Sequence, residues 1–190
     1  MNARISLRTV LLAAGLSLGA ALVAAPVMAE MTVMVGGAPM YPSKNIVENA
    51  VNSKDHTTLV AAVKAAGLVE TLEGPGPFTV FAPTNEAFEK LPAGTVDTLL
   101  KPENLAQLKK ILTYHVVAGK LTPKDIARQI KAGGGKATLT TVEGGTLTAM
   151  MQGRKLILTD EKGGTSTVTI ANVTQSNGVI DVVDTVLMPN

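Results

Sequence analysis

The side chains in this sequence that could take part in acid–base chemistry or metal binding are two histidines and, near the end of the chain, two aspartates. His56 and His115 lie far apart in the sequence, whereas Asp181 and Asp184 are three positions apart. The chain has no cysteine, which excludes a cysteine nucleophile, and two histidines alone do not make a multi-histidine metal site. His56 follows Asp55, which can cap a helix, and we expect His56 to be a solvated residue at that helix start.

His115 is expected to be at least partly buried. It lies between the apolar pairs 111–112 and 116–117. A buried imidazole needs a partner for its N–H group, and Asn85, Asp181 or a backbone carbonyl could supply one. A structural role is the favoured interpretation, and use in binding or catalysis is the alternative.

Asp181 and Asp184 could form a carboxylate pair for acid–base catalysis. The sequence places no histidine, serine or lysine beside them. A hydrogen-bonded or salt-bridged structural role is therefore the favoured interpretation.

Motifs typical of enzymes are absent. The sequence has no Gly-x-Ser-x-Gly elbow, no P-loop and no Gly-x-Gly-x-x-Gly motif, and the glycines at 133–135 lack the Lys-Ser/Thr pair of a phosphate-binding loop. We therefore expect that the protein is not an enzyme and needs no cofactor.

Residues 30–42 are expected to form a mobile N-terminal arm, because they contain Gly36–Gly37 and two prolines and show no clear periodicity. Met31, Met34 and Met40 could offer thioether ligands to Cu(I). Neither histidine lies within the arm, so an oxidisable tail without a metal is the favoured interpretation.

Residues 1–29 have the organisation of a secretory signal peptide. Two arginines precede an apolar run over 10–25, and Val27-Met28-Ala29 is a small-residue cleavage site before Glu30. The apolar run is short for a membrane span, which needs about 20 residues. The sequence thus predicts an exported protein, periplasmic or extracellular, without a transmembrane anchor after cleavage.

The net charge argues against nucleic acid as a partner. The signal holds two of the 17 basic residues and none of the 15 acidic ones, so the remaining chain carries 15 of each. Binding to phosphates depends on clustered lysines and arginines, and no basic run is present.

All three phenylalanines lie between residues 78 and 88. Residues 78–82 are apolar on both faces, which predicts an interior strand with Phe81 at its centre. Pro83 ends the strand, and Thr84 can cap a short helix that contains Phe88. Core formation should centre on this segment.

The chain is predicted to be helical in its N-terminal half and rich in strands in its C-terminal half, which indicates an α+β fold. Ser43, Asp55 and Thr122 are expected helix caps. Helices are expected over 44–52, 59–72, 95–100, 102–113 and from 122 to the glycines at 133–135, and strands over 137–142, 146–152, 155–159 and 167–173.

Three segments resemble signatures of the fasciclin-like (FAS1) domain family. Thr79 to Phe88 match the pattern T-V-F-A-P-T-N-x-A-F, residues 177–189 resemble the second signature, and Tyr114 to Leu121 resemble the Tyr-His segment. The resemblance implies a FAS1 domain over 43–190, with helices packed against a β-sheet wedge. The motif residues expected to be structural are Thr79, Phe81, Pro83, Thr84, Asn85, Phe88, His115, Asn177, Gly178, Asp181 and Asp184.

The resemblance also implies contacts between these motifs. In the family the second signature lies near the first in the central sheet, and the position of His115 is thought to tie the two together. Asp181 departs from the family pattern, where histidine or tyrosine is frequent.

The function implied by this resemblance is cell-surface or matrix adhesion through a surface protein or polysaccharide. Tyr114–His115 and Asp125–Ile126 resemble the Tyr-His and Asp-Ile motifs assigned to integrin contact in animal members. The alternative is an exported accessory subunit or small-ligand carrier that docks on a membrane complex of the envelope.

Overall fold

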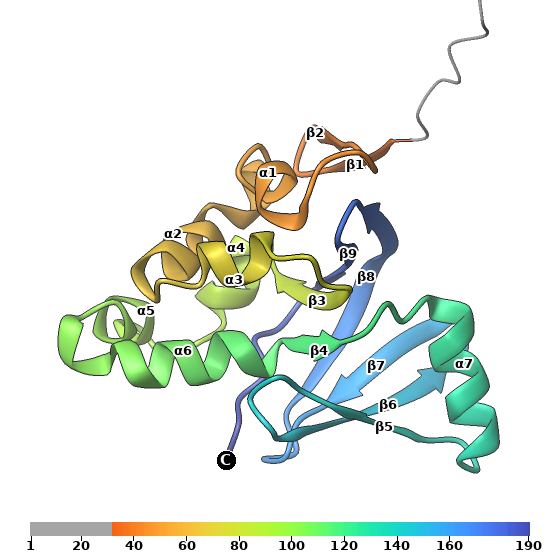
Figure 1. The fold of residues 1–190 in the computed structure, drawn as a ribbon. Helices are drawn as coiled ribbons and strands as arrows, with labels where there is room; N and C mark the ends of the chain where they lie inside the picture. Colours follow the sequence, from red (N-terminus) through yellow and green to blue (C-terminus); the bar gives the residue numbers. More distant parts are fainter. Residues whose placement is uncertain (1–31) are drawn as a thin grey trace, which may run out of the picture.

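The computed structural model describes residues 32–190, in which the helices within 46–114 lie on one side of a strongly curved sheet and the last helix covers its other end (Figure 1). The predicted signal peptide and cleavage site lie outside these residues. The helices are α1 (Ile46–Ala50), η1 (Lys54–His56), α2 (Thr57–Ala65), α3 (Val69–Glu73), α4 (Asn85–Glu89), α5 (Thr95–Leu99), η2 (Pro102–Asn104), α6 (Leu105–Tyr114) and α7 (Pro123–Ala132). The strands are β1 (Val33–Val35), β2 (Ala38–Met40), β3 (Phe78–Pro83), β4 (Val116–Ala118), β5 (Ala137–Thr140), β6 (Thr146–Gln152), β7 (Lys155–Thr159), β8 (Thr165–Gln175) and β9 (Gly178–Val183). The predicted α+β class is confirmed.

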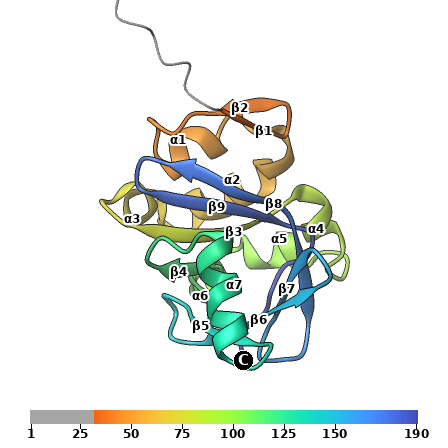
Figure 2. The ribbon, with the colours of Figure 1, turned by 90° about the vertical axis from the view of Figure 1, so that its right-hand side faces the viewer.

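The main sheet has the order β4-β3-β9-β8-β7-β6-β5. Strands β3 and β9 are parallel, with Phe81 opposite Asp181, and the other neighbours in this sheet are antiparallel. The two signature segments therefore lie side by side, as the resemblance implied. Figure 2 shows β8 and β9 crossing the molecule together.

The sheet curls until its two ends meet. The N–H of Val142 donates to the carbonyl of Val116 at 2.7 Å, and Val117 forms an isolated bridge with Thr141. Helix α7 packs on β5 and β6. The curvature creates an enclosed space that apolar side chains fill.

Strands β3 and β9 separate two hydrophobic cores. Val80, Ala82 and Val182 face the helices α1 to α6, whereas Phe81 and Val183 face the core between the curled sheet and α7. Both faces of this strand pair are buried, which explains why their sequences are apolar at successive positions.

The expected mobile arm is wrong for the part of it that the structure describes. Strands β1 and β2 form a hairpin, and its side chains Val35 and Met40 are each 2% exposed. The carbonyl of Gly36 accepts from the N–H of Lys54 at 3.1 Å. Each strand has only three residues, which is too short for a clear periodic pattern, and the glycines form the turn and Pro39 part of β2 instead of a mobile arm.

Two predicted helix caps are replaced by other residues. Asn45, not Ser43, caps α1 in a capping box with Glu48. The start of α2 has no capping side chain of its own, contrary to the expectation for Asp55. The side-chain oxygen of Asn85 instead accepts from the N–H of Thr58 at 3.0 Å.

Two other predicted caps are confirmed. Thr84 accepts from the N–H of Ala87 at the start of α4, and Thr122 forms a capping box with Asp125 at the start of α7. In both cases the capping threonine stands directly before the first residue of the helix, where the sequence pattern indicates the helix start.

Phe81→Ala is expected to destabilise the fold by roughly 3–5 kcal/mol, the range for deletion of a buried aromatic side chain. Phe81 is fully buried in the core between the curled sheet and α7. Urea unfolding measures the change, and Met151→Ala, at a position that is 43% exposed, is the control. A midpoint for Phe81→Ala equal to that of the control would contradict the position of the core.

Candidate functional site

Tyr114, the first residue of the Tyr-His segment, is fully buried at the end of α6. Its hydroxyl donates to the carbonyl of Thr146 at 2.6 Å and accepts from the N–H of Glu161 at 3.1 Å. Burial raises the pKa of Tyr114 to about 12. The side chain therefore anchors two turns of the sheet and is not accessible to a partner.

His115 connects three parts of the chain through hydrogen bonds to the backbone. Nδ1 donates to the carbonyl of Ile111 at 2.9 Å, and Nε2 accepts from the N–H of Leu187 at 3.0 Å. The backbone carbonyl of His115 accepts from the N–H of Phe81 at 2.9 Å. Helix α6, the first signature and the end of the second signature are thus joined at one residue.

The expected burial of His115 is confirmed, since the residue is 2% exposed. Of the three partners considered, the backbone carbonyl is right, whereas Asn85 and Asp181 bond elsewhere. Burial lowers the pKa of His115 to about 4. At neutral pH the ring is uncharged, with its proton on Nδ1, because Nε2 must accept a hydrogen bond.

Asp181 is a fully buried carboxyl group beside a bulge in β8. Its Oδ1 accepts from the N–H of Asn172 at 2.7 Å, at a residue whose φ of 61° is left-handed. Its Oδ2 has no hydrogen-bond partner among residues 32–190. Burial raises the pKa of Asp181 to about 6.

Asp184 does not share a hydrogen-bond partner with Asp181. It accepts from the N–H of Thr167 at 2.8 Å and from the hydroxyl of Thr185 at 3.1 Å. The two carboxylates hold two different places of the β8–β9 pair, and the geometry gives no support to a joint acid–base role.

The motif asparagines attach helices to neighbouring segments: Asn85 joins η1 and α2 to α4, and Asn177 joins α1 and α3 to the turn between β8 and β9. Asn85 accepts from Thr58 and donates to the carbonyl of Lys54 at 2.9 Å. Asn177 accepts from the N–H of Ile46 at 3.0 Å and donates to the carbonyl of Leu72 at 2.7 Å. Each side chain satisfies backbone groups at the ends of helices, which would otherwise be unpaired.

Asn49 has an equivalent role that the sequence analysis missed. It is fully buried, accepts from the N–H of Tyr41 at 3.0 Å and donates to the carbonyl of Tyr41 and to the side chain of Gln175. A polar residue on the apolar side of a short helix was the available signal. These contacts fix the N-terminal hairpin to the domain.

His56 is not the solvated residue that the sequence predicted, because it is 2% exposed. Its Nδ1 is hydrogen-bonded to the hydroxyl of Ser53 at 2.8 Å, and Nε2 has no partner within the described chain. Burial lowers the pKa of His56, and the backbone of Ala82 and the charge of Asp55 partly oppose this shift. The hairpin that covers His56 was not predicted, which explains the error.

The Asp-Ile pair lies on α7, on another element than the Tyr-His pair (Figure 1). Ile126 is fully buried in the core between the curled sheet and α7. Asp125 is partly exposed, accepts from Thr122 and pairs with Arg128. Hydrogen bonds from the Thr122 side chain and backbone lower the pKa of Asp125. Among the four predicted contact residues, only Asp125 is accessible at the surface.

No group of three or more histidine, cysteine, aspartate or glutamate side chains within residues 32–190 is placed to hold a metal ion. Met34 is 57% exposed and Met40 is buried, so these two thioethers do not point to a shared site. Met31 lies outside the described residues. In the same part of the chain, no helix has the length and apolar character to cross a membrane.

The fold is that of a FAS1 domain. A structure of a FAS1 domain pair from the insect cell adhesion molecule Fasciclin I superposes with a TM-score of 0.69 at 16% identity, covering 84% of this chain and 58% of that one. The fasciclin domain family model matches residues 54–189. The chain therefore belongs to the fasciclin domain family.

Bacterial relatives share more of the sequence. Protein sll1483 of Synechocystis is 48% identical over 160 residues, which cover 84% of this chain and 82% of the relative. Immunogenic protein MPB70 of Mycobacterium bovis is 39% identical, over 74% of this chain and 66% of the relative. Cell surface glycolipoprotein MPB83 of the same organism is 37% identical, over 74% of this chain and 58% of the relative.

His115 and Asp181 are expected to shift the pH dependence of stability in opposite directions. Between pH 4 and 6 the unfolded chain binds a proton at His115 that the folded protein does not, so this residue makes the free energy of unfolding rise with pH. Asp181 does the reverse, because the folded protein retains a proton that the unfolded chain releases. Each effect amounts to roughly 2–3 kcal/mol over this range.

Urea unfolding at pH 4, 5 and 6 separates the two residues. Relative to the parent, the free energy of unfolding of His115→Gln should fall as pH rises, and that of Asp181→Asn should rise. His56 is present in all three proteins, so its own titration does not affect the comparison. Three parallel pH profiles would show that neither group is held in its unfavoured protonation state.

Proposed function

We propose that this protein is an exported, non-catalytic FAS1 module that attaches to anionic polysaccharide of the cell surface or matrix. Its relatives include a protein described as a cell surface glycolipoprotein, which supports a role at the cell surface. Three motif residues whose side chains can ionise are buried and hydrogen-bonded to backbone groups: Tyr114, His115 and Asp181. Contact with a partner must therefore involve residues outside these buried motifs.

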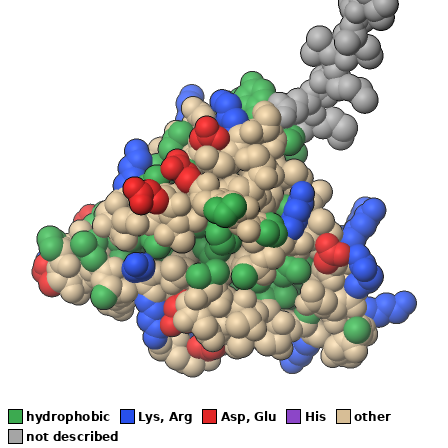
Figure 3. Space-filling view, viewed as in Figure 1, with side chains coloured by type: hydrophobic (Ala, Val, Ile, Leu, Met, Phe, Trp, Pro, Cys, Tyr) green, Lys and Arg blue, Asp and Glu red, His purple; other side chains and the backbone are tan. Residues whose placement is uncertain are grey.

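The exposed side of α7 is the proposed contact surface, and it carries the main support for the proposal. Five basic residues and a single acidic one, Asp125, lie between residues 120 and 136. The five basic residues are all exposed: Lys120, Lys124, Arg128, Lys131 and Lys136. In Figure 3 lysines and arginines gather over this part of the molecule.

The basic residues of α7 share one side of the helix. Lys124, Arg128 and Lys131 are spaced by four and three residues, which places them in one row. Asp125 neutralises only Arg128. A row of cations attracts a flexible polyanion, and the attraction weakens with salt. We therefore infer a carboxylated or sulfated polysaccharide as the partner.

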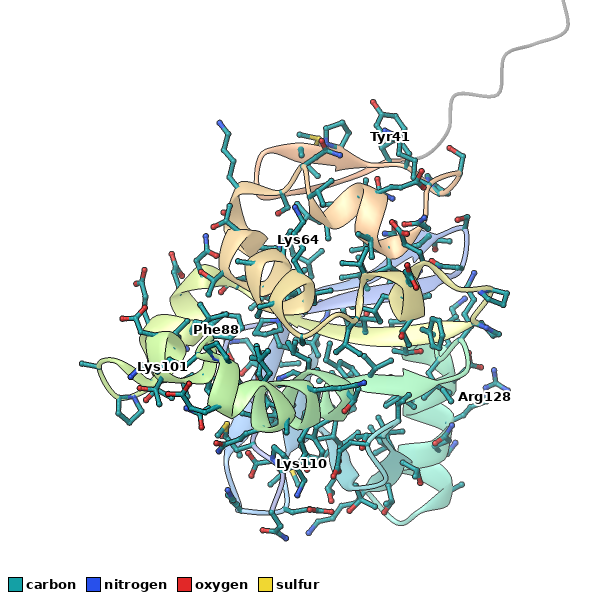
Figure 4. The ribbon with its side chains drawn as sticks, turned by 60° about the vertical axis from the view of Figure 1, so that its left-hand side comes forward. Tyr41, Lys64, Phe88, Lys101, Lys110 and Arg128 are labelled. Carbon is teal, nitrogen blue, oxygen red and sulfur yellow. The ribbon has the colours of Figure 1, made fainter. Side chains whose placement is uncertain are left out.

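Charge reversal on α7 is expected to weaken binding to an anionic polysaccharide at least tenfold. The test compares Lys124→Glu/Lys131→Glu with the matched control Lys64→Glu/Lys101→Glu, which changes the net charge equally on other elements (Figure 4). Alginate binding is measured at low and at physiological salt, with neutral dextran as the reference ligand. The control should bind alginate within twofold of the parent.

Equal losses in the two variants would contradict the assignment to α7 and indicate a general charge effect. Equal binding of dextran and alginate would contradict the electrostatic basis of the proposal. Capture of one membrane complex from envelope extract, without polysaccharide binding, would favour the accessory-subunit alternative.

One observation favours the second candidate function, an exported carrier of a small ligand. An apolar crevice runs between the helices and the β3–β9 wall, separate from α7.

A further inference from the structure

The apolar crevice lies between α2 and α3 on one side and α6 and β4 on the other. Its cavity volume is about 60 Å³. Figure 3 shows hydrophobic side chains gathered at the middle of this face, where the crevice reaches the surface. The inner wall includes Leu59, Val63, Leu68, Leu72, Val80 and Leu112.

His115 is the buried polar residue among those that line the crevice, and it has no hydrogen-bonding group free for a ligand, because both of its ring nitrogens are bonded to the backbone. A polar ligand group placed here would lose its bonds to water without replacement. The buried part of a ligand must therefore be apolar.

The mouth of the crevice differs from its interior. Lys64 lies in the last turn of α2, is exposed and lines the crevice, as do the exposed Thr71 and the partly exposed Thr113. Within residues 32–190 the structure gives Lys64 no ion pair. The hydroxyl of Thr113 already donates to the carbonyl of Lys109 at 2.8 Å. The opening thus offers one cation, Lys64, and the hydroxyl of Thr71 to a head group.

The narrow cavity limits the shape of the ligand. An apolar cavity that binds benzene measures roughly 150 Å³, more than twice the volume found here. The enclosed space is therefore too small for a ring and holds only a short stretch of a slender alkyl chain. We propose that the crevice binds a monomeric fatty acid, with its alkyl chain between the helices and the β3–β9 wall and its carboxylate beside Lys64.

This proposal develops the small-ligand carrier function and is independent of the α7 surface. Calorimetry with the parent protein tests it with hexanoate, octanoate, decanoate and laurate, all below their micellar concentrations. Affinity should rise about fourfold for each methylene that enters the crevice and then level off. Dodecyltrimethylammonium, whose alkyl chain is one methylene longer than that of laurate and whose head is cationic, should bind more weakly than laurate.

Two variants separate the chain site from the head-group site. Val60→Phe places a larger side chain at the half-buried wall of α2 and should reduce laurate affinity at least fivefold. Lys64→Glu should reduce laurate affinity roughly three- to tenfold. Lys131→Glu is the matched control, because Lys131 is also an exposed lysine in the last turn of a helix.

The control should bind laurate as the parent does while losing affinity for alginate, and Lys64→Glu should show the opposite pattern. Urea midpoints confirm that each variant is folded. Absence of binding for every chain length, equal losses in Lys64→Glu and Lys131→Glu, or parent-like affinity in folded Val60→Phe would overturn the proposal. None of these results would affect the assignment of α7.

Discussion

The parallel pairing of β3 with β9 is the constraint on which the rest of this structure depends. It joins two segments that lie about a hundred positions apart, and its two faces support two separate cores. Each strand must therefore be apolar at successive positions, unlike a strand with one face in water. His115 reinforces the pairing from the side, because its backbone carbonyl binds β3 and its ring binds the segment after β9.

Buried polar groups give this arrangement its specificity. Asn85 and Asn177 satisfy backbone groups at the ends of short helices, which have few stabilising contacts of their own, and Asn49 satisfies the backbone of Tyr41 directly after β2. The buried carboxyl group of Asp181 lowers the stability of the folded protein, because burial removes it from water. Within the described part of the chain, Oδ2 of Asp181 has no hydrogen-bond partner, while Oδ1 holds the bulge at Asn172.

The sequence predicted those parts of the fold that depend on local patterns. The strand at Phe81, the caps at Thr84 and Thr122 and the neighbouring signatures follow from apolar periodicity, capping chemistry and family resemblance. The hairpin consists of two strands too short to give a clear pattern. The remote cap by Asn85 and the burial of His56 depend on contacts between segments that lie apart in the sequence, which periodicity does not reveal. The candidate contact residues were only partly predictable, because the resemblance includes Ile126 among them, whereas Ile126 and Ile130 repeat at the i, i+4 spacing of a buried helix face.

The motifs build the interior of the protein and leave its surface available for binding. The hydrogen bonds of His115 predict that β3, His115 and the tail after β9 open as one unit. Native-state amide hydrogen exchange tests this at the N–H groups of Phe81 and Leu187, which are hydrogen-bonded to His115. The account predicts that both amides exchange only with the free energy of global unfolding, in step with each other. Exchange of Leu187 at a much lower free energy than Phe81 would show that the tail opens alone and would contradict the claim.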